Sequence, residues 1–349
     1  MTGPVRLALL FGGRSGEHAV SIVSADSVLA GLAQTPHQVT PVGIDRDGGW
    51  IVPCTPDQLR SDRPTPAQSA PAAARELVSG CDIVFPLLHG TYGEDGTVQG
   101  LLEMSGIAYV GSGVLGSAAG MDKAVMKSVF ERSGLKTAPW RLVRRTEWQN
   151  DRVGILQGLI GALGLPQFVK PANLGSSVGI SKADGRESLA AAIDLAAAYD
   201  TRIVCEKAVP DAREIEIAVL GNHEPEISVA GEVFPAREFY DYAAKYEDSA
   251  SRTQAPADLD PATARAVAAA ARSAFVALDL AGLARVDFLL SAGSGDLYIS
   301  EVNTMPGFTP ISMYPKLWSE SGLSYPELLN RLIELGLERA DERRQLRNA

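Results

Sequence analysis

Strand and helix patterns alternate along the first third of the chain, and this alternation restricts the possible fold more than any other feature. VRLALLF (5–11) is apolar except for Arg6 and predicts a strand, and SIVSADSVLAGLA (21–33) predicts a helix. Further strands are predicted at residues 39–45, 81–88 and 106–110. Such alternation is typical of α/β proteins, in which helices cover a parallel sheet. Residues 53–74 are rich in Pro, Ala and Ser and predict a surface loop.

A second segment begins near Met121. Asp122 is placed to cap a helix that ends at Gly134. Two strands are then predicted, at residues 166–172 and 202–209, with an Ala-rich helix between them.

A third segment begins near Glu214, where EIEIAVLG alternates as a strand does. Asp260 and Pro261 predict the start of a long helix, because proline is favoured at the first helical position. Two further strands, LARVDFLL and DLYISEVN, flank a short Gly/Ser stretch and predict an antiparallel hairpin. At 349 residues, the chain is long enough for two or three domains.

Charge and cysteine content limit the possible partners. A net charge of −10 argues against a general nucleic-acid binder and against binding to an anionic membrane surface. The first residues lack the pattern expected of a signal peptide, and the sequence has no run of 18 apolar residues. Three widely spaced cysteines without a CxxC pair fit a reducing compartment. We therefore expect a cytoplasmic protein with no nucleic-acid or membrane partner.

The predicted hairpin carries polar residues in an unusual pattern. Glu301 and Asn303 are two apart and share a face, as do Arg285 and Asp287 on the preceding strand. If the register places Asp287 opposite Glu301, two carboxylates and an amide oxygen converge, and these ligands suit Mg²⁺ or Mn²⁺. The alternative is a solvated sheet face with scattered acidic residues.

Two glycine-rich stretches are candidate phosphate sites. KPANLGSSVGI (170–180) follows a strand, and its glycines and serines could turn N–H and O–H donors toward an anion. The alternative is an ordinary turn. GSGVLG (111–116) matches a dinucleotide fingerprint, but it follows the last predicted strand of the first segment, and no acid stands about 20 residues later.

Further polar groups follow the strands of the first segment. Glu17 and His18 come after the first strand, and His89 follows another, so both strand ends offer polar groups to the edge where ligands bind in such sheets. For His18 and for His89 taken alone, a purely structural role is the simpler interpretation. EFYDYAAKYED (238–248) has three tyrosines and could form a lid over a site, or else an ordinary surface loop.

Taken together and in order, these motifs resemble those of the D-alanine–D-alanine ligases of the ATP-grasp superfamily. The matching stretches cover nearly the whole chain and are FGGRSGEH, LHGTYGEDGTVQG, YVGSGV…MDK, FVKPANLGSSVGI, REIEIAVLGN, EFYDYAAKY, ARVDF and EVNTMPGFTPISM. The resemblance implies a three-domain ATP-grasp fold: an N-terminal α/β domain with a parallel sheet (1–121) and two α+β subdomains (122–215 and 216–349). ATP is expected between the second and third domains, and the amino acids near the first.

The resemblance also implies the residues that bind ATP and metal. The expected ATP contacts are Lys123, Lys170 and Ser177 at the phosphates, Glu206, Lys207, Ala208 and Val209 around the adenine, and Glu214 at the ribose. Two Mg²⁺ or Mn²⁺ ions are expected on Asp287, Glu301 and Asn303.

A further set of residues is implied to act on the amino acids. Its members are Glu17 at the ammonium group of the first D-alanine, His89 nearby, Gly307 and Ser312 at the second D-alanine, Arg285 and Lys245 at the developing charge, and Ser176 and Tyr246, which tie the lid to Glu17.

The implied reaction joins two D-alanines with ATP through an acyl phosphate, for peptidoglycan-precursor synthesis by a homodimer. An enzyme of the same fold that makes D-alanyl-D-lactate or D-alanyl-D-serine is a competing hypothesis, although the lid motif EFYDYAAKY resembles the dipeptide-forming enzymes. Two hypotheses of a different kind are a nicotinamide-dependent oxidoreductase that uses GSGVLG and a nucleotide-binding regulator without catalysis.

Overall fold

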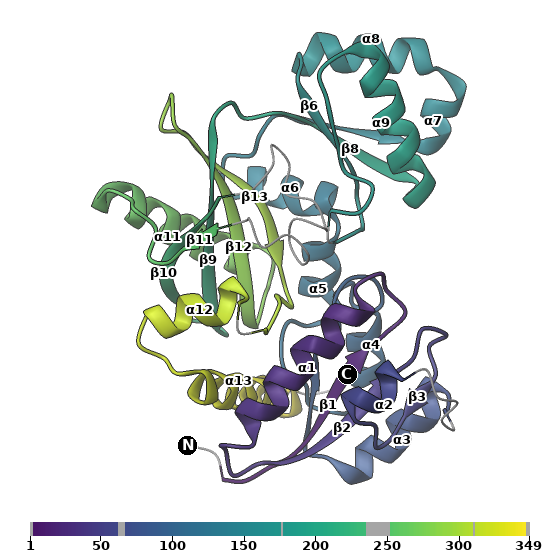
Figure 1. The fold of residues 1–349 in the computed structure, drawn as a ribbon, viewed down its shortest axis with the longest axis vertical. Helices are drawn as coiled ribbons and strands as arrows, with labels where there is room; N and C mark the ends of the chain where they lie inside the picture. The colour runs from purple at the N-terminus through teal and green to yellow at the C-terminus, as the bar shows by residue number, and fades with distance from the viewer. Residues whose placement is uncertain (1–2, 62–66, 176, 235–251, 310, 347–349) are drawn as a thin grey trace.

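The computed structural model describes residues 3–61, 67–175, 177–234, 252–309 and 311–346. The strands in these residues form three sheets, which follow one another along the long axis of the molecule in Figure 1. The predicted α/β architecture is confirmed, because the first sheet is largely parallel and the other two are antiparallel.

The first sheet has the strand order β3-β2-β1-β4. Strand β1 (Arg6–Gly12) is parallel to β2 (Gln38–Ile44) and to β4 (Ile83–Pro86), and β3 (Trp50–Ile51) is antiparallel to β2. The helices of this part of the chain are α1 (His18–Leu32), α2 (Pro56–Arg60), α3 (Ala70–Gly80), α4 (Thr97–Met104) and α5 (Val114–Met121). Side chains that follow β1 and β4 therefore meet at one edge of the sheet.

Two local predictions in this part are wrong. Residues 106–110 form no strand, and Tyr109 contributes only an isolated bridge to Val84. Helices α2 and α3 occupy much of the stretch whose composition predicts a loop. Thr55 and Gln58 form a capping box around Pro56 at the start of α2, so local capping outweighs the loop-like composition.

The second sheet has the order β5-β8-β6-β7. Its strands are β5 (Trp140–Arg144), β8 (Arg202–Lys207), β6 (Gln167–Pro171) and β7 (Ser181–Ala183), and its helices are α7 (Arg145–Asn150), α8 (Arg152–Leu163) and α9 (Arg186–Tyr199). Helix α6 (Lys123–Arg132) precedes them in the chain and packs against β13 and α11 of the third sheet. The predicted helix cap is confirmed, because Asp122 Oδ1 accepts hydrogen bonds from the backbone N–H groups of Ala124 and Val125 at 3.0 and 2.9 Å.

The third sheet has the order β11-β10-β9-β12-β13. Its strands are β11 (Arg252–Gln254), β10 (Glu226–Phe234), β9 (Ala212–Gly221), β12 (Gly282–Ser291) and β13 (Leu297–Asn303), and its helices are α11 (Pro261–Ala277), α12 (Met313–Glu320) and α13 (Tyr325–Gln345). The predicted hairpin of β12 and β13 is confirmed. Asp260 caps α11, as predicted, through the N–H groups of Ala262 and Thr263.

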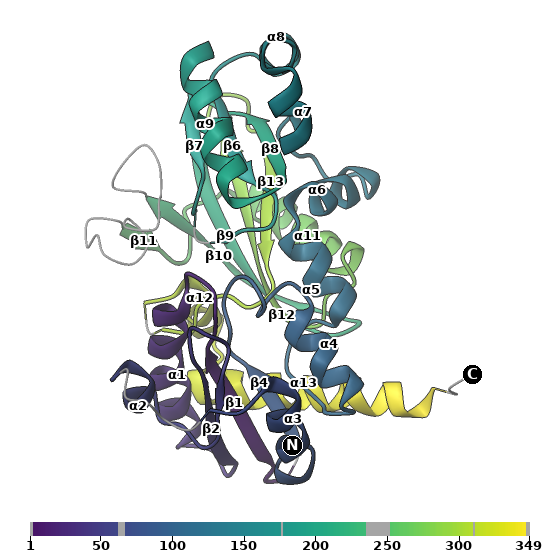
Figure 2. The ribbon, with the colours of Figure 1, turned by 90° about the vertical axis from the view of Figure 1, so that its right-hand side faces the viewer.

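The C-terminal helix α13 runs back to the first sheet and packs against α1 and β4 (Figure 2). One apolar core joins the two ends of the chain, and it includes Leu9, Phe85, Phe308 and Leu328, all fully buried. Each such side chain contributes about 1.5–3 kcal/mol when it leaves water. The loops after β1 and β4 are therefore held close to the loop after β13.

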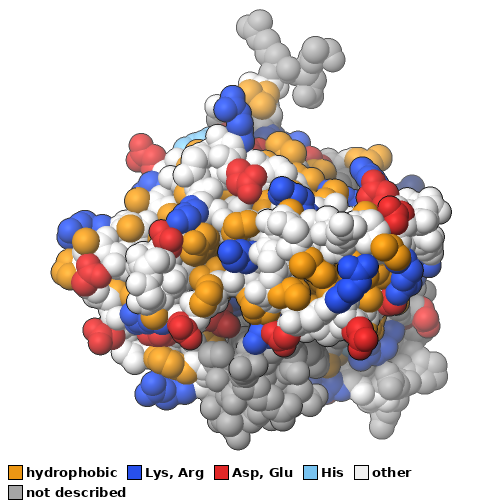
Figure 3. Space-filling view, turned by 90° about the horizontal axis from the view of Figure 1, so that it is seen from above, with side chains coloured by type: hydrophobic (Ala, Val, Ile, Leu, Met, Phe, Trp, Pro, Cys, Tyr) orange, Lys and Arg blue, Asp and Glu red, His pale blue; other side chains and the backbone are white. Residues whose placement is uncertain are grey.

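The surface shows no segregation of charge on the face that Figure 3 presents. Basic and acidic side chains are interspersed there over the described residues, rather than gathered into one basic stripe. No helix in the described part of the chain is both long and apolar enough to cross a bilayer.

Candidate active site

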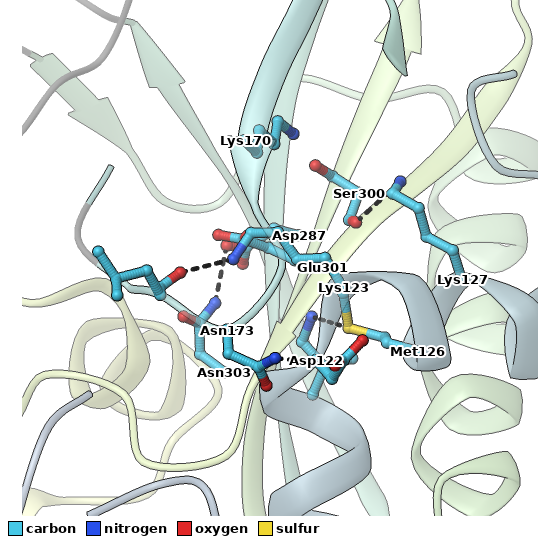
Figure 4. Close-up of polar contacts among 12 residues, drawn as sticks. Asp122, Lys123, Met126, Lys127, Lys170, Asn173, Asp287, Ser300, Glu301 and Asn303 are labelled. Carbon is cyan, nitrogen blue, oxygen red and sulfur yellow. Dashed lines mark hydrogen bonds and ion pairs between the residues drawn. The ribbon is translucent and has the colours of Figure 1, made fainter. Parts of the chain in front are cut away.

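The hairpin of β12 and β13 has the register that the metal prediction needs. Asp287 lies opposite Glu301, and Arg285 lies opposite Asn303. The Asn303 side-chain N–H donates to Asp287 Oδ2 at 3.0 Å, as Figure 4 shows for these neighbouring side chains. Two carboxylates and a carboxamide therefore gather on one face of the sheet, next to the buried core that Val286 and Val302 join.

A guanidinium group lies among the acidic side chains of this sheet. Arg285 donates to both carboxylate oxygens of Asp287 at 2.7 Å, and its Nε lies 3.1 Å from Glu216 Oε2. Burial alone would lower the pKa of Arg285, but Asp287, Glu216 and Glu301 outweigh it and hold the pKa well above its ordinary value. We call Glu216, Asp287 and Glu301, with Arg285 among them, the carboxylate cluster.

Glu216 was not among the predicted site residues. It lies on β9, opposite Asp287 in the register of β9 with β12. The alternation of REIEI places Glu216 on the same face as Glu214, so the strand pattern contained a signal for it.

A second ionic cluster has the opposite sign and lies between α6, β6 and β8. The Glu206 carboxylate lies between two ammonium groups, with Lys127 Nζ 2.5 Å from one oxygen and Lys170 Nζ 2.7 Å from the other. Burial alone would raise the pKa of Glu206, but the two lysines outweigh it and lower the pKa to about 2. We call Lys127, Glu206 and Lys170 the lysine cluster.

Lys127 was also missed by the sequence analysis. Its side chain is only 1% exposed, and its ammonium group also donates to the Ser300 carbonyl oxygen on β13 at 3.4 Å. Figure 4 shows this contact beside Glu301. Lys127 therefore connects the second sheet to the third.

A pocket lies beside Glu301 of the carboxylate cluster. Lys123, Gly175, Ser177, Glu301 and Asn303 are among the residues that line it. Lys123 Nζ donates to the Leu174 carbonyl oxygen at 2.7 Å and lies 3.8 Å from Glu301 Oε2. Lys123 thus joins the glycine-rich loop to β13.

The other predicted nucleotide contacts come from the 175–179 loop, from β8 and the residues that follow it, and from β9. Ser177 has a left-handed backbone, with φ of 59°, inside the 175–179 loop. Asn173 anchors the base of that loop by donating to Asp122 Oδ2 at 2.9 Å. Glu206 is buried in β8, Lys207 ends that strand and is exposed, and Ala208 and Val209 follow it partly exposed. Glu214 lies on β9 and is among the acidic groups that raise the pKa of Lys170.

Glu17 lies at the predicted edge of the first sheet, immediately before α1. Its carboxylate lies close to Gly90 and Gly175, because a Cβ atom at either glycine would come within 2.5 and 2.8 Å of Glu17 Oε2. Glu17 thus lies between the loop after β4 and the 175–179 loop. A side chain at Gly90 or Gly175 would collide with its carboxylate, so both positions need glycine.

His89 is buried close to Glu17. One ring nitrogen, Nδ1, lies 2.9 Å from the Met305 carbonyl oxygen, so it carries the proton and donates. The other, Nε2, lies 3.2 Å from Ser24 Oγ. Burial lowers the pKa of His89, and the Glu17 carboxylate opposes this shift. The imidazole is therefore neutral and fixed in one tautomer.

Glu94 is a third residue that the sequence analysis missed. Its two oxygens accept hydrogen bonds from the backbone N–H groups of Gly90 at 2.7 Å and Met305 at 3.0 Å. Burial and the Glu17 carboxylate raise the pKa of Glu94 to about 8. Glu94 therefore holds the loop after β4 against the loop after β13.

Ser312 and Gly307 lie in the loop between β13 and α12. Ser312 Oγ lies 2.7 Å from Thr309 Oγ1 and accepts a hydrogen bond from the Thr309 N–H. A Cβ atom at Gly307 would lie 2.8 Å from Ser312 Oγ, so the glycine allows this turn. Three predicted residues, Ser176, Lys245 and Tyr246, lie outside the described residues.

The GSGVLG stretch has a packing role in the structure. Gly111 has φ of 98°, and a Cβ atom at Gly282 would lie 3.1 Å from its backbone. The glycines therefore let the first and third sheets approach closely at the start of α5.

This three-sheet arrangement, with a pocket between two antiparallel sheets, is that of a ligase with the ATP-grasp fold. The models of the D-ala D-ala ligase N-terminus and C-terminus match residues 6–112 and 129–334. The chain belongs to the D-alanine–D-alanine ligase family.

Individual relatives agree with this assignment. The D-alanine–D-alanine ligase of Chloroherpeton thalassium is 48% identical over 359 residues, which cover 97% of this chain and 98% of that protein. The D-alanine–D-alanine ligase of Deinococcus radiodurans is 49% identical over 339 residues, which cover 95% of this chain and 98% of that protein. The solved structure of the Coxiella burnetii enzyme has a TM-score of 0.84 at 33% identity and covers 99% of this chain and 97% of that one.

Proposed function

We propose that this protein joins two D-alanines into D-alanyl-D-alanine and converts ATP to ADP and phosphate, for peptidoglycan-precursor synthesis. The observation that carries the proposal is the match of both family models in sequence order along one chain. The two ionic clusters support it, because they bring opposite charges together where Lys127 connects β8 to β13.

The chemistry explains why such a site is needed. A carboxylate is a poor acyl donor, because its leaving group would be oxide. Transfer of the γ-phosphoryl group of ATP to the carboxylate of the first D-alanine gives an acyl phosphate and ADP. The amine of the second D-alanine then attacks the acyl carbon, loses a proton, and expels phosphate. The enzyme must stabilise the negative charge on the transferring group, and Lys170 and Arg285 are placed to do so.

The residues present fit a divalent cation. Among the described residues, no three His, Cys, Asp or Glu side chains are arranged as a ready metal site. Asp287 and Glu301 nevertheless face each other beside Asn303, and all three offer the oxygen atoms that Mg²⁺ prefers. We propose that they hold two Mg²⁺ or Mn²⁺ ions, which would neutralise phosphate charge. Arg285 then has to give up Asp287 and keeps Glu216 as its partner.

We propose that the first D-alanine binds beside Glu17, which would pair with its ammonium group. His89 is neutral and buried there, so it adds no second positive charge near that ammonium group. Ser312 and Gly307 are proposed to bind the carboxylate of the second D-alanine. Glu94 is proposed to hold the loops that carry these groups in place.

The remaining roles rest on the family alone. Lys123, Ser177, Lys207, Ala208, Val209 and Glu214 are proposed to contact ATP as the resemblance implies. Ser176, Lys245 and Tyr246, which lie outside the described residues, are proposed to close the site over the acyl phosphate.

We also propose domains at residues 1–121, 122–215 and 216–349, as the resemblance implies. The protein is further proposed to act as a homodimer in the cytoplasm, where ATP is available. Size measurement in solution by light scattering tests the dimer, and a monomer at micromolar concentration would contradict it.

Release of ADP and phosphate on mixing the protein with Mg-ATP and D-alanine tests the activity most simply. We expect D-alanine-dependent ADP release, formation of the D-alanyl dipeptide, and no release with L-alanine. ADP release that is independent of D-alanine, or no release, would contradict the proposal.

A second candidate function is ligation of D-alanine to another D-substrate. The solved D-Ala:D-Ser ligase VanG from Enterococcus faecalis has a TM-score of 0.83 at 32% identity and covers 96% of this chain and all of that one. Competition of D-alanine with D-serine or D-lactate at neutral pH separates the two functions. Dipeptide of D-alanine as the main product supports the first, and a mixed product as the main one supports the second.

A further inference from the structure

The lysine cluster contains a residue whose burial needs an explanation. Lys127 is 1% exposed, and its described polar partners are Glu206 and the Ser300 carbonyl oxygen. An ammonium group is costly to bury unless it is paired. Two lysines on one carboxylate also give a surplus of positive charge inside the protein.

The two lysines differ in their freedom to move. Lys170 lies near the end of β6, and 13% of its side chain is exposed. The chain continues from β6 into the glycine-rich 175–179 loop. Lys127 is enclosed on α6 and is held from two sides, by β8 and by β13. Lys170 can therefore turn to a phosphate, whereas Lys127 stays on Glu206.

The electrostatic consequence concerns Glu206. When Lys170 turns away, one Glu206 oxygen is released while the other remains on Lys127. A buried carboxylate without any cation would take up a proton or hold Lys170 back. An ionised carboxylate only accepts hydrogen bonds, so it accepts the exocyclic amine of adenine and repels the carbonyl oxygen that hypoxanthine carries at the same place.

We propose that Lys127 is a positioning residue that sets the preference for adenine, by keeping Glu206 fixed as a hydrogen-bond acceptor while Lys170 serves the phosphates. The proposal rests on the proposed function only in taking Glu206 as a contact of the base. Lys127 touches neither nucleotide nor amino acid and acts through Glu206.

Calorimetric titration with Mg-ADP and with Mg-IDP, its hypoxanthine counterpart, tests this role without D-alanine. We expect the wild-type protein to prefer ADP, and Lys127→Met to lower the ratio of the two affinities by about tenfold or more, because a protonated Glu206 can also donate to the carbonyl oxygen. A merely structural lysine would weaken both nucleotides equally. Lys136→Met provides the matched control, because Lys136 forms an exposed ion pair with Asp296.

The double variant Lys127→Met with Glu206→Gln keeps the test decisive if the single variant does not fold, because it replaces the buried pair by neutral side chains of similar size. Its ADP preference should also be low. A wild-type ratio in either folded variant would overturn the proposal, as would failure of the wild-type protein to bind ADP or to prefer it. A protein that binds ADP selectively but releases none with D-alanine would overturn the proposed function alone.

Discussion

The lysine cluster and the carboxylate cluster are built alike and carry opposite charges. In the lysine cluster, one carboxylate lies between two buried ammonium groups. In the carboxylate cluster, one guanidinium group lies among three carboxylates. The first belongs to the second sheet and α6, and the second belongs to the third sheet. Neither cluster is neutral: the lysine cluster has one more positive group than negative, and the carboxylate cluster has more negative groups than positive.

The difference in charge indicates where the parts of a metal–nucleotide complex would bind. Phosphates suit the side with surplus ammonium groups, and divalent cations suit the side with surplus carboxylates. Under the proposed function, Lys127 would keep its ion pair with Glu206, whereas Arg285 would leave Asp287 and interact with the charge on the substrate. Four changes would break or sharpen this comparison.

The largest effect is expected in the carboxylate cluster. Glu301→Gln should lower turnover by about 10²–10³-fold while the fold is kept, because one metal ligand loses its charge. ADP release under saturating Mg-ATP and D-alanine measures this. Asp296→Asn, on the same hairpin but in an exposed ion pair, should retain wild-type turnover. Unchanged turnover in Glu301→Gln would refute the metal assignment.

In the lysine cluster, Glu206→Gln should lower the free energy of unfolding by about 3 kcal/mol at pH 7, because two buried ammonium groups lose their counter-ion. The depressed pKa of Glu206 means that its contribution is present above the ordinary value of 4.5 and is lost as the pH falls toward about 2. Urea unfolding should therefore show the gap between wild type and variant narrowing by about half at pH 3. A gap independent of pH would show that Glu206 is not an ionised partner.

Asp287→Asn should have opposite effects on ADP binding with and without metal. Metal-free ADP should bind better than to the wild-type protein, because a repelling carboxylate is removed and Arg285 is released from it. Mg-ADP should bind about tenfold less tightly, because a metal ligand is weakened. Titration with Mg²⁺ and with EDTA measures both. A change in the same direction under both conditions would contradict the proposal that Asp287 binds metal and repels metal-free phosphates.

Glu216→Gln should have the smallest effect, a loss of about 1 kcal/mol in the free energy of unfolding, because Arg285 keeps Asp287 when nothing is bound. Chemical denaturation measures this loss. The control Glu226→Gln, at the exposed start of β10, should change stability by no more than about 0.5 kcal/mol. Equal free energies of unfolding for the two variants would show that the ion pair of Glu216 with Arg285 does not stabilise the protein.

The sequence predicted the carboxylate cluster better than the lysine cluster, and the reason is local geometry. A short loop between two alternating strands predicts a hairpin, and the alternation shows which residues share a face. The register itself stayed conditional, because a bulge between Asp287 and Phe288 is what brings Asp287 opposite Glu301. The partners of Glu206 come from α6 and β6, which meet only through tertiary packing. A lysine on a helix with both polar and apolar residues normally has its ammonium group in water. The residues around Lys127 in the sequence therefore do not indicate that it is buried.

The same reason explains the errors in the fold. Tyr109 and its neighbours are apolar and resemble a strand, but only one bridge to Val84 forms before Gly111 turns the chain toward Gly282. Helix α3 forms from an Ala-rich stretch whose prolines suggested a loop, because Ala73 and Leu77 pack into the apolar core beside the first sheet. Contacts with distant segments decide both cases.

Location of bound manganese in crystals grown with Mn²⁺ and ADP tests the central claim most directly. The account predicts anomalous scattering peaks within bonding distance of Asp287, Glu301 and Asn303, with the ADP phosphates between them and Lys170. Manganese bound elsewhere, or phosphates that lie away from Lys170, would contradict it.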